Sequence, residues 1–227
     1  MTGKTIDNTD QWRYENDQDT QFTHEIANLP QHKPQIPVKV KRLHPDAVIP
    51  KYAHEGDAGF DLVAVEDVIV EPGETVKVPT GLAFELPPGY EMQIRPRSGV
   101  TLKTKLRVQL GTVDASYRGE VNVIIDNIAQ RVYYVDDGVN EYGEIFVINR
   151  EAHDRILRTV NGDQELRLDE AYPRGTYIIR KGDRIAQAVI NAVPRAVITE
   201  VNELSESGRG TGGFGSTGVN AHIMSSD

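Results

Sequence analysis

The chain has 227 residues, a formal net charge of −9 and no cysteine. The missing cysteines exclude disulfides, thiolate metal sites and a cysteine nucleophile. The negative charge argues against general binding to nucleic acid or to an anionic membrane, while a local basic pocket for a small anion stays possible. No window approaches the ~18 apolar residues of a membrane span, and no secretory signal pattern opens the chain. We therefore expect a cytoplasmic protein.

Three regions differ in texture along the chain. Residues 1–36 are polar with scattered apolar side chains and are predicted to be an extension. Residues 37–200 contain short runs rich in Val and Ile, separated by Gly, Pro and Asp, which predict an all-β sandwich, jelly roll or barrel. Within this core, the shared face of Ala152, Ile156, Leu157 and Val160 predicts one helix over 150–160. Residues 201–227 lose regular patterning and form a C-terminal arm.

Two stretches carry groups suited to nucleotide chemistry. "RPRSGV" at 95–100 offers a guanidinium, a hydroxyl and backbone N–H groups beside a glycine, a combination that suits a phosphate. "GTVDASYRGEV" at 111–121 reads as a tight hairpin. Its carboxylate, Asp114, can position a water, and Tyr117 can wall off a sugar or base. Taken alone, the first stretch is more often an exposed turn, and the second is equally often an Asx-turn with a packing tyrosine.

Three further segments carry polar or charged side chains among apolar residues or glycines, where a ligand could be their partner. "DAGFDLVA" at 57–64 brings Asp57 and Asp61 around a small turn, and "KGDRIAQAVI" at 181–190 places Arg184 and Gln187 in an otherwise apolar strand. Both segments are also compatible with ordinary turn chemistry. The tail "GRGTGGFGST" at 208–217 has the glycines of a flexible linker. Because it also carries Arg209 and Phe214, it could instead fold over a ligand.

Taken in order, "DAGFDL", "RPRSG", "GTVDASYRGEV", "GDRIAQ" and "RGTGGFGSTG" closely resemble the five motifs of the trimeric dUTPases, the deoxyuridine triphosphate nucleotidohydrolases. The resemblance covers residues 57–218 in discontinuous pieces. It implies a β jelly roll that forms a homotrimer, with each active site built from more than one chain. The implied reaction is hydrolysis of dUTP to dUMP and pyrophosphate, which limits uracil in DNA and supplies dUMP for dTMP synthesis.

The resemblance also implies a role for each matching residue. Asp114 would orient the water that attacks the α-phosphorus, and Tyr117 would pack under the deoxyribose and exclude a 2′-hydroxyl. Phe214 would stack on uracil, and Arg209 would reach the γ-phosphate. The full set of implied substrate contacts is Arg97, Ser98, Gly99, Gly111, Thr112, Val113, Tyr117, Arg184, Gln187, Arg209, Phe214, Gly215 and Ser216. The implied cofactor is Mg²⁺, held by the three phosphates and by water, with Asp61 reached through water only.

The sequence departs from the family pattern at two places. Many relatives carry an asparagine where this chain has Val108, so one contact of the base pocket is expected to differ. Compared with compact family members, about forty residues near 130–175 are expected to be an insertion between the third and fourth motifs. They are similar to an extra segment in some dUTPases of phages of Gram-positive hosts, where regulatory contacts to other proteins have been proposed. An insertion in a surface loop that only packs on the trimer is slightly favoured over such a regulatory contact, because loops tolerate insertions.

Three other functions remain to be weighed. A dCTP deaminase would share the fold and the phosphate turn, but it would need a catalytic glutamate in the third motif, and Glu120 follows the glycine. A regulatory protein could bind a partner through the insert and the N-terminal extension. A β-rich phage structural protein would explain the jelly roll and none of the motifs. The intact motif residues favour the hydrolase.

Overall fold

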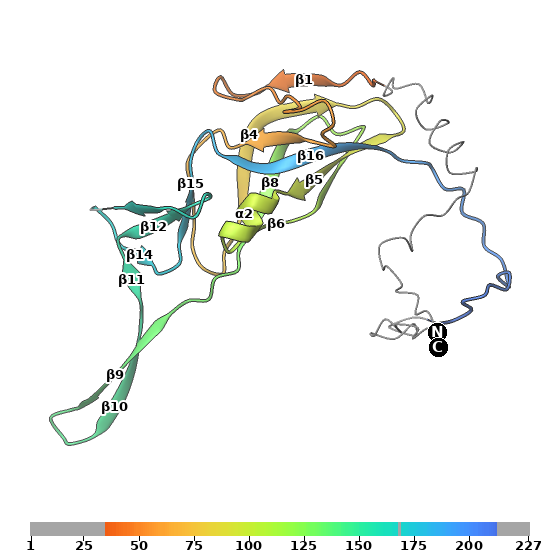
Figure 1. The fold of residues 1–227 in the computed structure, drawn as a ribbon. Coiled ribbons are helices and arrows are strands. Elements are labelled where there is room, and N and C mark those ends of the chain that lie inside the picture. Colours follow the sequence, from red (N-terminus) through yellow and green to blue (C-terminus); the bar gives the residue numbers. More distant parts are fainter. Residues whose placement is uncertain (1–34, 168, 213–227) are drawn as a thin grey trace, which may run out of the picture. The chain divides into compact units, whose positions relative to one another are not determined.

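The computed structural model describes residues 35–167 and 169–212. These residues fall into two compact units, one that extends to Val193 and one that begins at Pro194. The first unit holds every strand of the described chain (Figure 1). In the part that the structure describes, no helix is long and apolar enough to cross a bilayer.

Three four-stranded sheets form most of the first unit. The first has the order β1-β4-β8-β6, built from Lys39–Arg42, Thr75–Glu85, Glu120–Asn127 and Leu106–Val108. The second has the order β2-β16-β5-β7, built from Phe60–Val63, Arg184–Ala192, Tyr90–Pro96 and Gly111–Asp114. The third has the order β13-β12-β15-β3, built from Gln164–Leu166, Ile156–Thr159, Tyr177–Ile179 and Val68–Val70. All neighbours pair antiparallel except β12 and β15, which are parallel.

The core follows from the period-2 alternation of these strands. In β8, Val121, Val123 and Ile125 point inward and are almost fully buried, while the residues between them are half-buried or exposed. They meet apolar side chains of the other strands, among which Leu62, Leu82, Met92, Leu106, Ile179 and Ile185 are fully or almost fully buried. This architecture confirms the predicted all-β jelly roll.

The helix predicted over 150–160 is wrong. Those residues form the end of β10 (Ile145–Glu151), then β11 (His153–Asp154) and β12. Ala152, Leu157 and Val160 are buried as the pattern suggested, but Leu157 is buried from a strand that pairs with both β13 and β15. A short apolar run fits helix and strand alike, and here neighbouring strands supply the hydrogen bonds. The helix of the described residues is instead α2 (Ser98–Lys103), directly after β5.

The residues near 130–175 form two small antiparallel pairs besides β12 and β13. The first is the hairpin of β9 (Tyr133–Val139) and β10, which extends away from the other strands in Figure 1. The second pairs β11 with β14 (Tyr172–Pro173). The extent of the insert, residues 130–175, stays a prediction.

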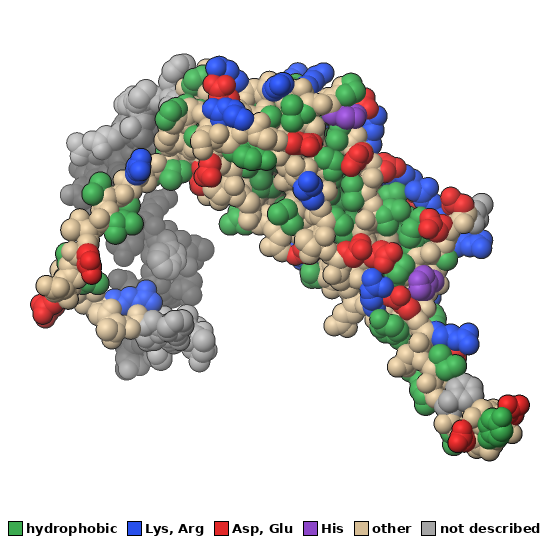
Figure 2. All heavy atoms as spheres, turned by 180° about the vertical axis from the view of Figure 1, so that it is seen from behind, with side chains coloured by type: hydrophobic (Ala, Val, Ile, Leu, Met, Phe, Trp, Pro, Cys, Tyr) green, Lys and Arg blue, Asp and Glu red, His purple; other side chains and the backbone are tan. Residues whose placement is uncertain are grey.

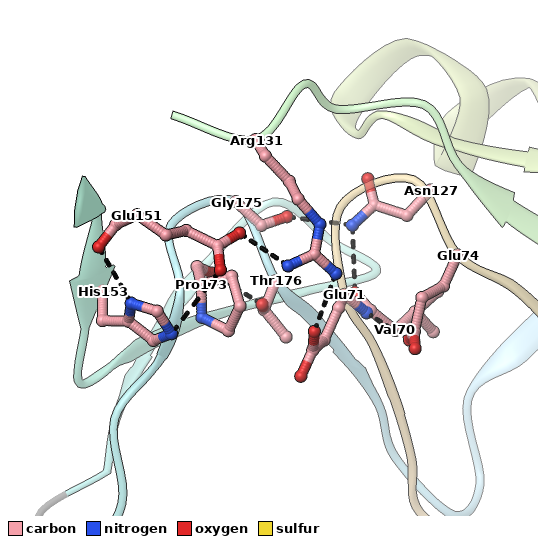
Figure 3. Close-up of polar contacts among 10 residues, drawn as sticks. All are labelled: Val70, Glu71, Glu74, Asn127, Arg131, Glu151, His153, Pro173, Gly175 and Thr176. Carbon is pink, nitrogen blue, oxygen red and sulfur yellow. Dashed lines mark hydrogen bonds and ion pairs between the residues drawn. The ribbon is translucent and has the colours of Figure 1, made fainter. Parts of the chain in front are cut away.

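A polar cluster fixes the root of this segment (Figure 3). Arg131 donates to Glu151 at 2.6 Å and to Glu71 at 3.1 Å, which ties β10 to the loop after β3. The side-chain amide of Asn127, which is 1% exposed, donates to the carbonyl oxygens of Val70 and Gly175. Asn127 therefore joins the end of β8 to both neighbouring segments, and a buried amide with such partners holds one geometry.

Candidate functional site

Three polar residues lie in one row across the second sheet. The pairing register places Asp61 of β2 opposite Gln187 of β16, and Gln187 opposite Arg95 of β5. A bulge in β16 between Arg184 and Ala186 shifts the register just before this row. Side chains alternate between the two faces of a sheet. The three polar side chains of the row therefore share one face, while Leu62, Ala188 and Ile94, which are next to them in sequence, point to the core.

A pocket of about 250 Å³ opens at the end of this row. We call it the Arg97 pocket. Its wall is polar where the strands end and apolar or small where β2 begins. The lining residues are Lys51, Ala53, Asp57, Ala58, Gly59, Phe60, Asp61, Arg97, Ser98 and Gln187. Arg97 is the last residue before α2, and Ser98 opens that helix, so Gly99 lies in its first turn.

Two arginines hold the Asp61 carboxylate. Arg97 Nε lies 2.8 Å from one oxygen, and Arg184 Nη1 lies 3.5 Å from the other. A second nitrogen of Arg97 donates to the Arg184 carbonyl oxygen at 2.8 Å. Gln187 donates to the Pro96 carbonyl oxygen at 2.9 Å. These contacts lock β16 to the β5–α2 junction and orient the Arg97 guanidinium at the pocket.

The tight turn before β16 sets the direction of that strand. Gly182 adopts φ +93°, and Asp183 accepts a hydrogen bond from the Arg180 amide at 2.7 Å. Burial raises the pKa of the Asp183 carboxyl. A hydrogen bond from the Lys181 amide lowers the pKa of the Asp67 carboxyl, and the Arg180 guanidinium lowers it further. These contacts attach the turn to the loop before β3. Arg184 follows the turn, and its side chain points to Asp61.

The third motif lies at the other end of β5. Gly111, Thr112, Val113 and Asp114 form β7, and Asp114 pairs with Glu91, one residue after β5 begins. The Arg97 pocket lies beyond Pro96, where β5 ends. Five residues of strand separate the two ends by about 17 Å. One chain therefore brings Asp61, Arg97, Ser98, Arg184 and Gln187 together, and it does not bring Asp114 to them.

Tyr117 is fixed beside Asp114 by the turn that follows β7. The Tyr117 amide donates to the Asp114 carbonyl oxygen at 3.0 Å, and the Tyr117 hydroxyl lies 3.2 Å from the Glu120 carbonyl oxygen. A Cβ on Gly119 would stand 2.4 Å from that hydroxyl, so any other residue at 119 would displace the ring from this position. The Glu120 carboxylate accepts from the Gly81 amide at 2.8 Å.

The C-terminal arm belongs to the second unit. Arg209 Nε donates to the Gly212 carbonyl oxygen at 2.7 Å, and the Gly210 amide donates to the Ser207 hydroxyl at 3.1 Å. These bonds close a turn that presents the Arg209 side chain to solvent. Phe214, Gly215 and Ser216 lie outside the described residues.

The structure adds pocket residues that the motifs did not indicate. Lys51 and Ala53 line the Arg97 pocket, although they precede the first motif. No residue pattern identifies them, because the chain between 44 and 57 has no strand and reaches the pocket only through the fold. Val108, expected to change a base contact, is buried in the core.

Known proteins of one family resemble the chain in sequence. The family model described as dUTPase matches residues 46–139, which span β2 to β9. The deoxyuridine 5'-triphosphate nucleotidohydrolase of Thermobifida fusca is 42% identical over 188 residues, which are 82% of this chain and 81% of that protein. The chain therefore belongs to the dUTPase family.

Solved structures of phage dUTPases resemble the chain in three dimensions. The dUTPase of Staphylococcus bacteriophage 80alpha, solved with dUPNHPP, has a TM-score of 0.70 and 32% identity, covering 81% of this chain and 99% of that one. A mutant dUTPase from phage phi11 of S. aureus has a TM-score of 0.62 and 30% identity, covering 74% and 97% of the two chains. That structure is described as revealing the coordination of a structural Mg(II) ion.

Gly59 provides a test of the pocket's backbone. A Cβ there would lie 2.6 Å from the Ala188 carbonyl oxygen and 3.0 Å from Val189, whereas a Cβ on Gly56 meets nothing within 4 Å. Gly59→Ala is expected to lower the free energy of unfolding by about 1–3 kcal/mol, because the β2–β16 pairing must shift. Gly56→Ala should leave it nearly unchanged. Urea denaturation measures both, and equal stabilities would contradict the close packing at the pocket.

Proposed function

We propose that this protein hydrolyses dUTP to dUMP and pyrophosphate. The observation that carries the proposal is the Arg97 pocket. There Ser98 of the second motif and Gln187 of the fourth lie beside the Arg97 guanidinium, which the Asp61 carboxylate holds in place. Membership of the dUTPase family supports the same reaction. Arg97, Ser98, Gly99 and Gln187 would hold the triphosphate, with Arg184 orienting Asp61 and Arg97.

The catalytic water would be held by Asp114. The water oxygen forms a bond to the α-phosphorus, the bond from that phosphorus to the bridging oxygen breaks, and pyrophosphate leaves. Asp114 accepts a hydrogen bond from the water and aligns its lone pair with the phosphorus. Tyr117, held by the turn that follows β7, would pack under the deoxyribose and leave no space for a 2′-hydroxyl. The strand Gly111–Val113 would read uracil through main-chain groups, which cytosine cannot satisfy.

A complete site then requires more than one chain. Asp114 lies about 17 Å along β5 from the Arg97 pocket, and an orienting carboxylate must lie within hydrogen-bond reach of the water. A second copy would bring its Asp114 to the pocket, as expected in a homotrimer with three shared sites. The arm would complete the site with Arg209 on the γ-phosphate and with Phe214, Gly215 and Ser216 near the base.

Magnesium fits this site as an ion carried by the substrate. The described residues contain no group of three His, Asp or Glu side chains that could hold a metal. Both oxygens of Asp61 already face arginines, so its carboxylate suits contact through a water better than direct ligation. When bound, the ion would neutralise charge on the phosphates. Mg²⁺ also prefers to keep several waters.

The deaminase alternative is not favoured. It would need a free glutamate near the third motif, but the Glu120 carboxylate already accepts the Gly81 amide at 2.8 Å. That bond fixes β4 where Gly81 adopts a positive φ of 66°, so Glu120 has a structural role.

Asp114→Asn tests the assignment of the water. The amide keeps the shape of the side chain but orients the water poorly, so kcat for dUTP is expected to fall by about 10²–10⁴-fold. Affinity for a non-hydrolysable dUTP analogue should stay within a few-fold. Asp137→Asn, an exposed carboxylate of β9, is the control and should behave as the unaltered protein. Near-normal turnover by Asp114→Asn would show that another group orients the water.

The insert supports a second function, contact with a regulatory protein. Its β9–β10 hairpin exposes apolar side chains that no other strand of the described residues covers, visible along the hairpin in Figure 2. They include Tyr133, Tyr134, Val135, Val139, Tyr142, Ile145 and Val147, each at least half exposed. Exposed apolar groups of this extent mark interaction surfaces. The 80alpha relative is described among phage dUTPases that control transfer of virulence genes by a G protein-like mechanism.

Removing the hairpin separates the two functions. The Ala152 amide donates to the Val132 carbonyl oxygen at 2.7 Å, and Tyr133 pairs with Glu151, so the ends of the hairpin already meet. A short Gly-Ser turn can therefore replace residues 134–150 and leave the Arg131–Glu151 contact in place. dUTP hydrolysis by this variant should stay within about twofold, because the hairpin does not line the Arg97 pocket. Binding to a regulatory protein should be lost. Equal binding by both forms would contradict the assignment of the hairpin.

A further inference from the structure

A second hollow adjoins the Arg97 pocket. It has a volume of about 560 Å³, and we call it the Arg42 pocket. The lining residues are Arg42, Ala47, Val48, Ile49, Pro50, Lys51, Tyr52, Ala53, Asp61, Val63 and Arg184. Lys51, Ala53 and Asp61 also line the Arg97 pocket, so the two hollows share a wall. None of the five motifs accounts for Arg42, Lys51 or the apolar segment between 47 and 50.

The Arg42 pocket is locally cationic in an acidic protein. Its wall holds three basic residues, Arg42, Lys51 and Arg184, and one acidic residue, Asp61, while the whole chain carries a net charge of −9. Asp61 is already compensated by Arg97 and Arg184. Among the described residues, Arg42 and Lys51 have no hydrogen-bonding or ion-pair partner for their side chains. Within the part of the chain that the structure describes, two positive charges therefore line the hollow without a counter-charge.

The remaining wall is apolar and carries no charge that would repel an anion. It consists of Val48, Ile49, Pro50 and Tyr52, of which Val48 and Tyr52 are about half exposed. A small, highly charged anion suits such a place better than an apolar ligand, because an apolar ligand would leave both cations unpaired. The triphosphate chain, bound in the adjoining pocket, yields one such anion at each turnover.

We propose that the Arg42 pocket binds pyrophosphate, with Arg42 and Lys51 as its ligands, and receives this product from the Arg97 pocket. The proposal rests on the hydrolysis of dUTP for the source of the anion, but the binding itself does not require turnover. Lys51 lies between the two hollows and can contact the anion in either of them. Arg42 reaches only the second, so it separates a product site from the substrate site.

Calorimetric titration of the full-length protein with inorganic pyrophosphate tests the proposal. Arg42→Gln and Lys51→Gln should each weaken binding about threefold to tenfold, since each removes one of the positive charges that line the hollow. Lys41→Gln is the matched control. It removes a charge from the same strand as Arg42, but Lys41 points to the other face of β1 and lines neither pocket. It should bind pyrophosphate as the unaltered protein does.

Parallel titrations identify the source of the anion and separate the two proposals. The affinities for inorganic phosphate and for dUMP should change little in Arg42→Gln. Inhibition of dUTP hydrolysis by the product pyrophosphate should weaken in the same variant. Pyrophosphate binding that is equal in Arg42→Gln and in the Lys41→Gln control would overturn the proposal, even with normal dUTP hydrolysis. Pyrophosphate binding that depends on Arg42 in a protein without dUTP hydrolysis would support the pocket and refute the proposed reaction.

Discussion

The pairing of β16 between β2 and β5 is the constraint on which the candidate site depends. Its register places Asp61, Gln187 and Arg95 in one row, and the bulge after Arg184 allows that arginine to face Asp61 as well. A shift by one residue would send every polar group of the row into the core and expose the buried alanines. Close contact between Gly59 and Ala188 opposes such a shift. The same pairing that completes the jelly roll therefore aims Arg97 at its pocket.

The sequence predicted the fold class well, because short alternating runs such as β8 specify a sheet with one buried face. It failed between 150 and 160, where buried Leu157 fits a helix or a strand equally and distant β15 decides. The motifs named Asp61, Arg97, Ser98 and Gln187 as site residues, and these four line one pocket, while their roles toward substrate stay predictions. Lys51 could not be found this way, since only the path of the chain through residues 44–57 brings it to the pocket. The distance between Asp114 and the pocket could not be predicted from the sequence, because it depends on how β7 pairs with β5.

The insert and the site are joined through one strand without sharing residues. β8 begins at Glu120, next to the turn that holds Tyr117, and ends at Asn127, which holds the root of the insert. The hairpin beyond that root adds exposed apolar surface and lines neither pocket. Such an arrangement allows a protein contact to be gained or lost while the catalytic groups keep their geometry.

We infer that a working site combines Asp114 of one chain with the Arg97 pocket of another. Mixed trimers made from equal amounts of Asp114→Asn and Arg97→Ala chains test it directly. Each variant alone should be inactive towards dUTP. Because every mixed trimer contains one site with both unaltered groups, the mixture should recover about a quarter of the unaltered activity. A mixture as inactive as its parents, with mixed trimers shown to form, would place the whole site within one chain and contradict the account.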